Sequence, residues 1–393
     1  MALHPSLTAP KIPRNRDRLD PVEKMGRNEL CWCLSGKKYK FCHSGRERQK
    51  KINAYQLEQK MLEELRKGYC SHPAPSSDNP CSDTIIKAHT VQKKGGLTAI
   101  AEAGHVLTVK PTMKEMIKTK GNPQPRKIGV RMASVFPGFC GNHDSSLFKP
   151  IEGKSLSLNT ETAFLFSYRA VAYERFSKEA EHRNILNMRE ADRGMPFWEQ
   201  AAMQSTLYDL LAGVELGKRD VNRLKNQFDR QSISGSHKDF HFVAIRFDCI
   251  LPVVACGAFH PEFDLNGTPL QQLGQDSFDL DFVTLTVTTF GENTIGVFGW
   301  IGPTNGPARA LVDSFLAIEN SRKADAMVRL LFIHTDNLFL RESWWADLPT
   351  ISQNILNDMT RSGTPVRMRA GPEFSDASLR LVIANTVDTV SDR

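Results

Sequence analysis

Residues 26–45 read GRNELCWCLSGKKYKFCHSG, and this stretch decides how the N-terminal part of the chain folds. Two cysteines stand one residue apart near its start, and an adjacent Cys-His pair follows a segment that contains Gly36. Glycine adopts the left-handed backbone of a reversal without steric cost, so the two pairs are expected to meet. Thiolate and imidazole groups suit zinc, and four of them close a structural site. We therefore expect a zinc knuckle, with the ligands Cys31, Cys33, Cys42 and His43.

This spacing closely resembles the SEC-C motif, best known as the zinc-binding tail of the SecA preprotein translocase motor. The resemblance covers residues 26–45 and implies a device that docks on ribosomes or partner proteins, without catalysis. Members usually have Pro after the first cysteine and Gly-Ser-Gly after the second, where this chain has Trp32 and Leu34-Ser35-Gly36. We expect metal binding to persist, and an exposed Trp32 to change which partner is bound. A knuckle that only stabilises the fold is the alternative.

The composition is that of a globular protein with several domains. A chain of 393 residues exceeds the ~250–300 residues at which one core stops growing. Its apolar stretches are shorter than the ~18 residues that a membrane span needs, so we expect no span. The polar, basic N-terminus does not resemble a signal peptide, which predicts a cytoplasmic protein. Its eight cysteines are then expected to stay reduced, so their clustering indicates metal ligation and not disulfides.

Charge is distributed unevenly along the chain. Residues 1–66 hold 15 Lys and Arg against 8 Asp and Glu, and residues 82–131 hold 10 against 3. The remainder from residue 132 holds 25 against 32, so it is acidic. Clustered cations favour binding to phosphate backbones, which predicts that the N-terminal third contacts RNA, DNA or the ribosome. A merely solvated basic surface is the alternative.

A second set of metal-ligand side chains lies in residues 68–152, which are rich in Gly, Pro, Cys and His. Two pairs with a long separation, and a histidine on a strand between them, are typical of a treble-clef metal module. The predicted ligands of this second zinc ion are Cys70, Cys81, Cys140 and His143. Two further histidines of the segment, His72 and His105, are alternatives for one ligand.

The segment also resembles the HNH nuclease family, through KAHTVQ at residues 87–92 and FCGNHDSSLF at residues 139–148. The resemblance implies that His89 is the general base and that Asp144 lies near an additional divalent metal. Ala88 stands where many members have an acidic ligand, the first cysteine pair is widely spaced, and the intermediate asparagine has no match unless it is Asn142. An inactive or purely structural treble clef is therefore an equal alternative.

Periodicity predicts the remaining elements, and the fold class is α+β with several domains. Helical spacing begins near Thr160 and continues to Phe228, and strand-like alternation follows from His241 as an antiparallel meander. Two more helices are predicted over residues 307–333 and 343–363, the second ending at Gly363. The predicted divisions are a flexible basic arm (1–25), the SEC-C knuckle (26–45), a connector helix (46–67), a treble-clef or HNH-like zinc module (68–152) and an α+β domain (153–393).

The function predicted from these features is that of a cytoplasmic two-zinc adaptor, whose basic N-terminal third docks on nucleic acid, the ribosome or a protein partner. The alternative is a metal-dependent HNH-like nuclease, in the role of a defence effector, with His89 as its base. A third hypothesis makes both zinc sites structural and places any activity in residues 155–393. The sequence does not predict a substrate or an oligomeric state.

Overall fold

The computed structural model describes residues 19–73, 78–153, 156–274, 276–361, 371 and 378–392. These residues form two compact units, and neither unit is one continuous stretch. The first takes in the residues up to Lys67, Ser177–Asp220 and Gly274–Phe278, and the second takes in Gly68–Phe176, Val221–Leu273 and the chain from Asp279 onward. The arm predicted over residues 1–25 lies mostly outside the described residues. The other four predicted segments, from the knuckle to the α+β domain, stay predictions of separately folded domains.

The first unit joins the Cys-rich segment to a helix that follows it. Helix α1 spans Ala54–Glu64, and the Asn53 side chain caps it by accepting a hydrogen bond from the amide of Gln56 at 2.7 Å. The helix predicted over residues 46–67 is thus confirmed for its middle part only. Its first predicted turn is a short 3-10 helix, η2, at Arg46–Arg48, and another, η1, spans Tyr39–Phe41.

Two long helices, α5 (Thr160–Met188) and α6 (Phe197–Ser234), each contribute residues to both units. Within the first unit their apolar side chains form a small core of Ile185, Leu207, Leu211 and Val214. In the same unit Arg183 of α5 donates a hydrogen bond to Glu64 of α1 at 3.0 Å. The described helices include none whose length and apolar composition would together allow it to span a membrane.

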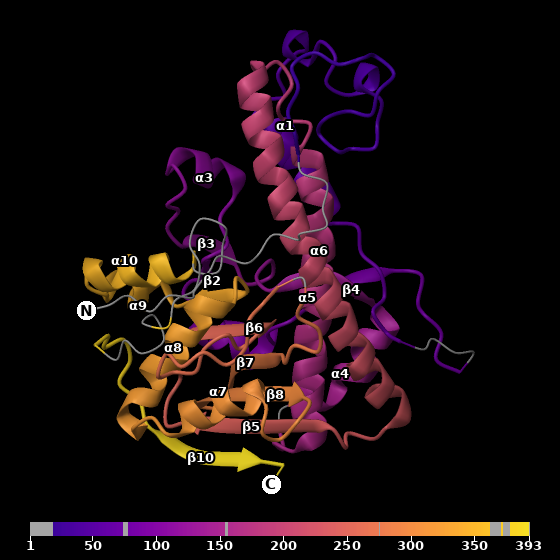
Figure 1. The fold of residues 1–393 in the computed structure, drawn as a ribbon. Helices are drawn as coiled ribbons and strands as arrows, with labels where there is room; N and C mark the ends of the chain where they lie inside the picture. Colours follow the sequence, from indigo (N-terminus) through magenta and orange to yellow (C-terminus); the bar gives the residue numbers. More distant parts are fainter. Residues whose placement is uncertain are drawn as a thin grey trace. The chain divides into compact units, whose positions relative to one another are not determined.

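The second unit contains one eight-stranded sheet in which every pair of neighbours is antiparallel (Figure 1). Its strands, in spatial order, are β10 (Thr386–Ser391), β5 (Phe240–Phe247), β8 (Asn293–Ile301), β7 (Val283–Phe290), β6 (Val253–Phe259), β9 (Leu338–Leu340), β2 (His105–Thr108) and β3 (Arg126–Gly129). The predicted meander is correct for β6, β7 and β8. It is wrong for β5, which pairs with β8 and not with β6.

Alternation along β5 places side chains in cores on both faces of the sheet. Val243, Ile245 and Phe247 belong to the core that includes residues of α7 (Pro307–Leu316) and α8 (Lys323–His334). The intervening residues Phe240, Phe242 and Ala244 belong to the core that includes α5. Both faces of the sheet are therefore covered by helices, as the period of two residues requires.

The two predicted C-terminal helices are each divided in the structure. The first becomes α7 and α8, separated by the 3-10 turn η4 at Asn320–Arg322. The second becomes α9 (Glu342–Asp347) and α10 (Thr350–Met359), because Pro349 disfavours helical backbone in the residue before it. The predicted helix end at Gly363 lies outside the described residues.

A two-stranded sheet and the helix that follows it carry Cys140 and His143 of the second group, whereas Cys70 and Cys81 lie in loops. Strand β1 (Ile85–His89) pairs antiparallel with β4 (Val135–Cys140), and α4 (Gly141–Glu152) follows β4 directly. The chain between these strands forms the irregular turn η3 (Lys93–Leu97), α2 (Thr98–Ile100), β2, α3 (Met113–Lys118) and β3. Because β2 pairs with β9, this long connection contributes two strands to the large sheet.

Candidate metal centres

The first cluster is built by a tight reversal at residues 30–38. Leu30 and Lys38 form an antiparallel bridge, and the amide of Cys31 donates to the carbonyl of Lys37 at 2.9 Å. Gly36 has a φ of 72°, in the left-handed region, as the sequence predicts. The reversal brings the two cysteines of the first pair beside Cys42 and His43, although the pairs are separated in sequence.

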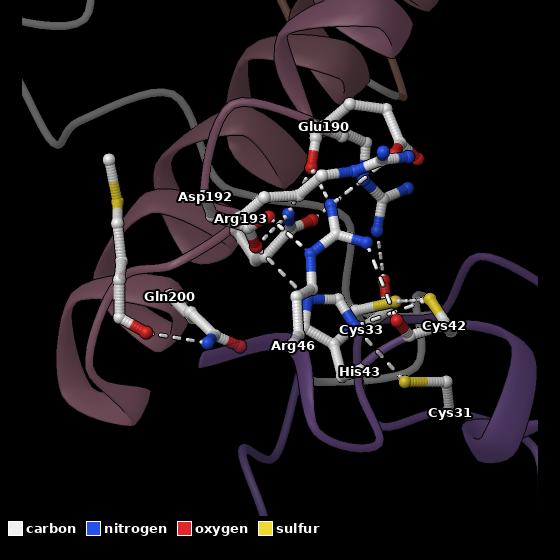
Figure 2. Close-up of polar contacts among 12 residues, drawn as sticks. Cys31, Cys33, Cys42, His43, Arg46, Glu190, Asp192, Arg193 and Gln200 are labelled. Carbon is white, nitrogen blue, oxygen red and sulfur yellow. Dashed lines mark hydrogen bonds and ion pairs between the residues drawn. The ribbon is translucent and has the colours of Figure 1, made fainter. Parts of the chain in front are cut away.

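The four side chains of this cluster converge on one point (Figure 2). The Nδ1 atom of His43 lies 3.3 Å from the Sγ of Cys31 and 3.2 Å from the Sγ of Cys42. The Sγ atoms of Cys33 and Cys42 are 3.4 Å apart. Four atoms held ~2.1–2.3 Å from a zinc ion in a tetrahedron stand about 3.4–3.8 Å apart, so this donor set fits zinc closely.

Hydrogen bonds among the side chains of the first cluster shift their pKa values. A hydrogen bond with Cys33 raises the pKa of the Cys31 thiol, and the same interaction lowers the pKa of Cys33. Burial alone would lower the pKa of His43, but hydrogen bonds to Asp192, Cys33 and Cys42 raise it to about 10. A divalent cation must displace the remaining protons, so metal binding at this cluster weakens as pH falls.

Trp32 is not the exposed aromatic residue that the sequence predicts. It is 5% exposed, and its ring lies 4.4 Å from the imidazole of His43 and 5.8 Å from the ring of Phe197, between centroids. The prediction failed because the residue that covers Trp32 comes from the start of α6, far away in sequence. Trp32 therefore shields the histidine of the cluster from water.

Polar side chains from the α5–α6 connection surround the same histidine (Figure 2). Asp192 is fully buried, and its carboxylate lies 3.0 Å from the Nε2 of His43. It also accepts a hydrogen bond from Gln204 at 2.7 Å and pairs with the guanidinium of Arg46. Burial would raise the pKa of Asp192, but the hydrogen bond with His43 and the charge of Arg46 hold it below its ordinary value. Nothing in the local sequence indicates this contact.

The second cluster brings together the four ligand-type residues that the sequence predicts. The Nδ1 of His143 lies 3.3 Å from the Sγ of Cys70, 3.5 Å from that of Cys81 and 3.2 Å from that of Cys140. This set also fits a tetrahedral zinc ion. Cys140 precedes α4 and accepts a hydrogen bond from the His143 amide. Burial would raise the pKa of Cys140, but hydrogen bonds from the backbone of His143 and Ser82 lower it to about 6.

The loop that carries Cys81 supplies the outer support of this cluster. The Nε2 of His143 lies 3.1 Å from the backbone carbonyl of Asn79. Asn142 donates to the Asn79 side chain at 3.0 Å and to the carbonyl of Pro80 at 2.8 Å, so it holds this loop. Cys81 itself is exposed, whereas Cys140 and His143 are buried.

A buried polar group supports the chain next to Cys70. The Nζ of Lys225 donates to the carbonyl of Ser71 at 3.0 Å and to the hydroxyl of Tyr168 at 2.9 Å, and it pairs with Asp229. Burial lowers the pKa of Lys225, and the charge of Asp229 opposes this effect. The sequence analysis missed these residues, because a lysine within a long polar helix is normally exposed.

The two histidines considered as substitute ligands have other positions. His72 stacks on His143 with ring centroids 3.9 Å apart, and its pKa is lowered by burial. His105 is exposed, and its Nδ1 lies 2.8 Å from the carbonyl of Ala103. Within the described part of the chain, neither belongs to a group of ligand atoms that could hold a metal ion.

His89 and Asp144 both lie near the Arg169–Glu152 ion pair, which measures 2.7 Å. The charges of both members of this pair act on the pKa of His89 and on that of Asp144. Burial lowers the pKa of His89, against a hydrogen bond with the backbone of Val130, and burial raises the pKa of Asp144. Among the described residues, the Nε2 of His89 and the Oδ1 of Asp144 are buried without a hydrogen-bond partner.

Comparison with curated proteins and with solved structures gave no match. The resemblance of residues 68–152 to HNH nucleases therefore stays a prediction. The family model that matches describes the SEC-C motif and covers residues 27–45, which include all four side chains of the first cluster. The chain thus carries a SEC-C motif at residues 27–45, together with two Cys/His clusters that could each hold a metal ion.

Proposed function

We propose that this protein is a zinc-binding adaptor, whose basic N-terminal third docks on the phosphate backbone of a nucleic acid. Zinc is held by two ligand sets in this proposal: Cys31, Cys33, Cys42 and His43 in the first, and Cys70, Cys81, Cys140 and His143 in the second. The SEC-C motif and the convergence of both sets support zinc binding. The metal supplies structural cross-links, and the contact with nucleic acid belongs to side chains elsewhere.

The observation that carries the docking role is a basic groove of about 600 Å³ within residues 93–132. Lys93, His105 and Arg131 line it, and the other lining residues are small or apolar. All three side chains are exposed, and among the described residues no carboxylate forms an ion pair with Lys93 or Arg131. Unpaired cations along a groove fit phosphate groups, whose counterions they displace.

Salt-dependent binding of the full-length protein to a fluorescent single-stranded RNA tests this role. Replacing Lys93 and Arg131 with Ser should weaken binding and reduce the magnitude of the slope of log K against log salt by about 1.4, since each contact with a single strand contributes about 0.7. The matched control replaces Lys149 and Lys238 with Ser. Both side chains are exposed outside the groove, and their replacement removes the same charge. Equal loss in both double variants contradicts the groove. Binding to purified ribosomes without binding to RNA would favour a protein surface instead.

A second candidate function, a metal-dependent nuclease, is favoured by the two orphaned atoms on His89 and Asp144. Burial keeps His89 neutral near pH 7, the state in which an imidazole accepts a proton from water. Val130, whose backbone bonds His89, also lines the basic groove. A phosphodiester bound in that groove would therefore lie near a general base, and Asp144 would supply a carboxylate ligand to an additional divalent ion.

A plasmid-nicking assay in Mg²⁺ or Mn²⁺ separates the two functions. We expect no nicking by the wild-type protein, because Ala88 leaves the divalent ion without the acidic ligand that the strand supplies in HNH nucleases. The test variant is His89→Ala, and His182→Ala is the matched control, since His182 lies on α5 and does not line the groove. Nicking by wild type and by the control, lost in His89→Ala with unchanged zinc content, would establish the nuclease.

A further inference from the structure

Asp192 lies in the connection between α5 and α6, and all three of its neighbours donate to it. His43 and Gln204 share its Oδ2 at 3.0 and 2.7 Å, and the Nε of Arg46 donates to Oδ1. The carboxylate is fully buried, so it depends on these donors for its solvation. Figure 2 shows Asp192 on the side of the His43 ring that faces away from the cysteines.

This contact determines which ring nitrogen of His43 faces the metal cluster. A carboxylate accepts hydrogen bonds and cannot donate one, so the Nε2 that faces Asp192 must carry a proton. In the neutral imidazole the lone pair is then on Nδ1, the atom that lies 3.2 and 3.3 Å from the sulfurs of Cys42 and Cys31. We infer that Asp192 is a positioning residue, which orients His43 with Nδ1 toward a metal ion and raises the affinity of the first cluster.

The same connection is tied to the cluster by a second set of bonds. Arg189 donates to the carbonyl of Cys33 and to the Gln204 side chain, and its own carbonyl accepts from Arg46 at 2.8 Å. The amide of Gly194 donates to the carbonyl of Arg46 at 3.0 Å. The α5–α6 connection is therefore the outer shell of the SEC-C knuckle. This conclusion rests on the proposed metal ligation by the first cluster.

The experiment compares Asp192→Asn with Glu190→Gln in the full-length protein. Asparagine keeps the shape of the side chain but removes the charge that faces His43 and Arg46. Glu190 lies in the same connection and near Arg46, at 3.7 Å, and among the described residues it forms no hydrogen bond with His43, so it is the matched control. Zn²⁺ affinity is measured by competition with a chromophoric chelator, and the first cluster is identified as the phase that Cys42→Ser removes.

We expect Asp192→Asn to weaken this phase by about 10–100-fold and to leave the second phase unchanged. Glu190→Gln should stay within about 2-fold of wild type. If Cys42→Ser removes no phase, the proposed ligation itself fails. If Cys42→Ser removes a phase and Asp192→Asn binds as tightly as wild type, only the role of Asp192 is overturned.

Imidazole ¹⁵N NMR of His43 in the zinc-loaded protein gives a readout that a merely structural role would not move. The expected spectrum has the metal on Nδ1 and a proton on Nε2, and Asp192→Asn should shift the Nε2–H signal while Glu190→Gln should not. Where Asp192→Asn is not recovered folded, the wild-type spectrum decides, because metal on Nε2 would overturn the inference.

Discussion

The two Cys/His clusters have the same donor set and differ in what stands behind the histidine. Both present three sulfurs and an Nδ1 atom. Behind the first histidine lies the buried carboxylate of Asp192, at 3.0 Å, and behind the second lies the backbone carbonyl of Asn79, at 3.1 Å. A carboxylate strengthens the basicity of a ligating imidazole more than a neutral carbonyl does.

The clusters also differ in solvent access and in the core beside them. The first is covered by Trp32, and its Cys31 and Cys33 belong to a small core with Trp32 and Tyr39. The second has one exposed ligand, Cys81, yet its Cys140 is buried at the end of β4 beside the large aromatic core that contains Phe139 and Phe148. The first cluster thus depends on polar support and the second on its core, which leads to the following predictions.

Replacing Cys140 with Ser should have the largest effect, because it removes a metal ligand and leaves a buried hydroxyl in its place, even though Ser can still cap α4. We expect Cys140→Ser to lower the Tm by on the order of 10 °C and to lose one zinc equivalent. Differential scanning calorimetry and elemental analysis measure both. Cys249→Ser, outside either cluster, serves as the control, and an equal loss of Tm there contradicts this interpretation.

Cys42→Ser should release the first zinc ion and leave the second cluster intact. Cys42 contacts His43 and Cys33, which lie with it in the first cluster. Elemental analysis should show one equivalent lost, and hydrogen exchange should increase in η1, η2 and the residues that follow Met188. Loss of protection throughout the eight-stranded sheet would show that the clusters fold as one cooperative system.

Zinc should leave the second cluster several-fold faster than the first when a strong chelator is added, because Cys81 is exposed and the ligands of the first cluster are mostly buried. Release followed by absorbance should show two phases. The slow phase should be absent in Cys42→Ser. A missing fast phase in that variant would reverse the assignment and disprove the argument from exposure.

The smallest effect is expected for Asp144, whose Oδ1 is buried without a hydrogen-bond partner among the described residues. Burial raises its pKa above 3.8, so the folded protein binds more protons than the unfolded chain in the acid range. Its ionisation therefore lowers the free energy of unfolding as pH rises through the folded pKa. Asp144→Asn should match wild type near pH 3.5 and have a Tm about 2–4 °C higher at pH 7. A lower Tm at pH 7 would mean that the carboxylate has a stabilising partner.

Local features of the sequence predicted the first cluster well. Its four residues stand in two closely spaced pairs, and Gly36 between the pairs has the left-handed backbone of a reversal. The four residues of the second cluster could be predicted to lie together because Cys and His are rare enough to form a pattern even across a long connection. In both cases the chemistry of the ligand identifies the residue, and no knowledge of the surrounding fold is needed.

The features that could not be predicted from the sequence depend on contacts between residues that are far apart in the chain. Phe197 covers Trp32, and Asp192 supports His43, but neither is marked by local spacing. The pairing of β5 with β8 depends on the choice of partner strand, which alternation along one strand does not encode. The end of α9 before Pro349 could have been predicted from the sequence, since proline restricts the backbone of the residue before it. The single helix predicted over residues 343–363 was wrongly extended across this proline.

The separation of 149 residues between His43 and Asp192 has a consequence for synthesis of the chain. At ~5–20 residues per second, the four donor atoms leave the ribosome roughly 7–30 s before the carboxylate that orients one of them. In the proposed role of Asp192, the four donor atoms can therefore meet a metal ion before the carboxylate exists, and Asp192 can hold the ring only when the α5–α6 connection is complete. Metal loading and final ring orientation are thus two steps, separated by the time needed to translate the segment between them.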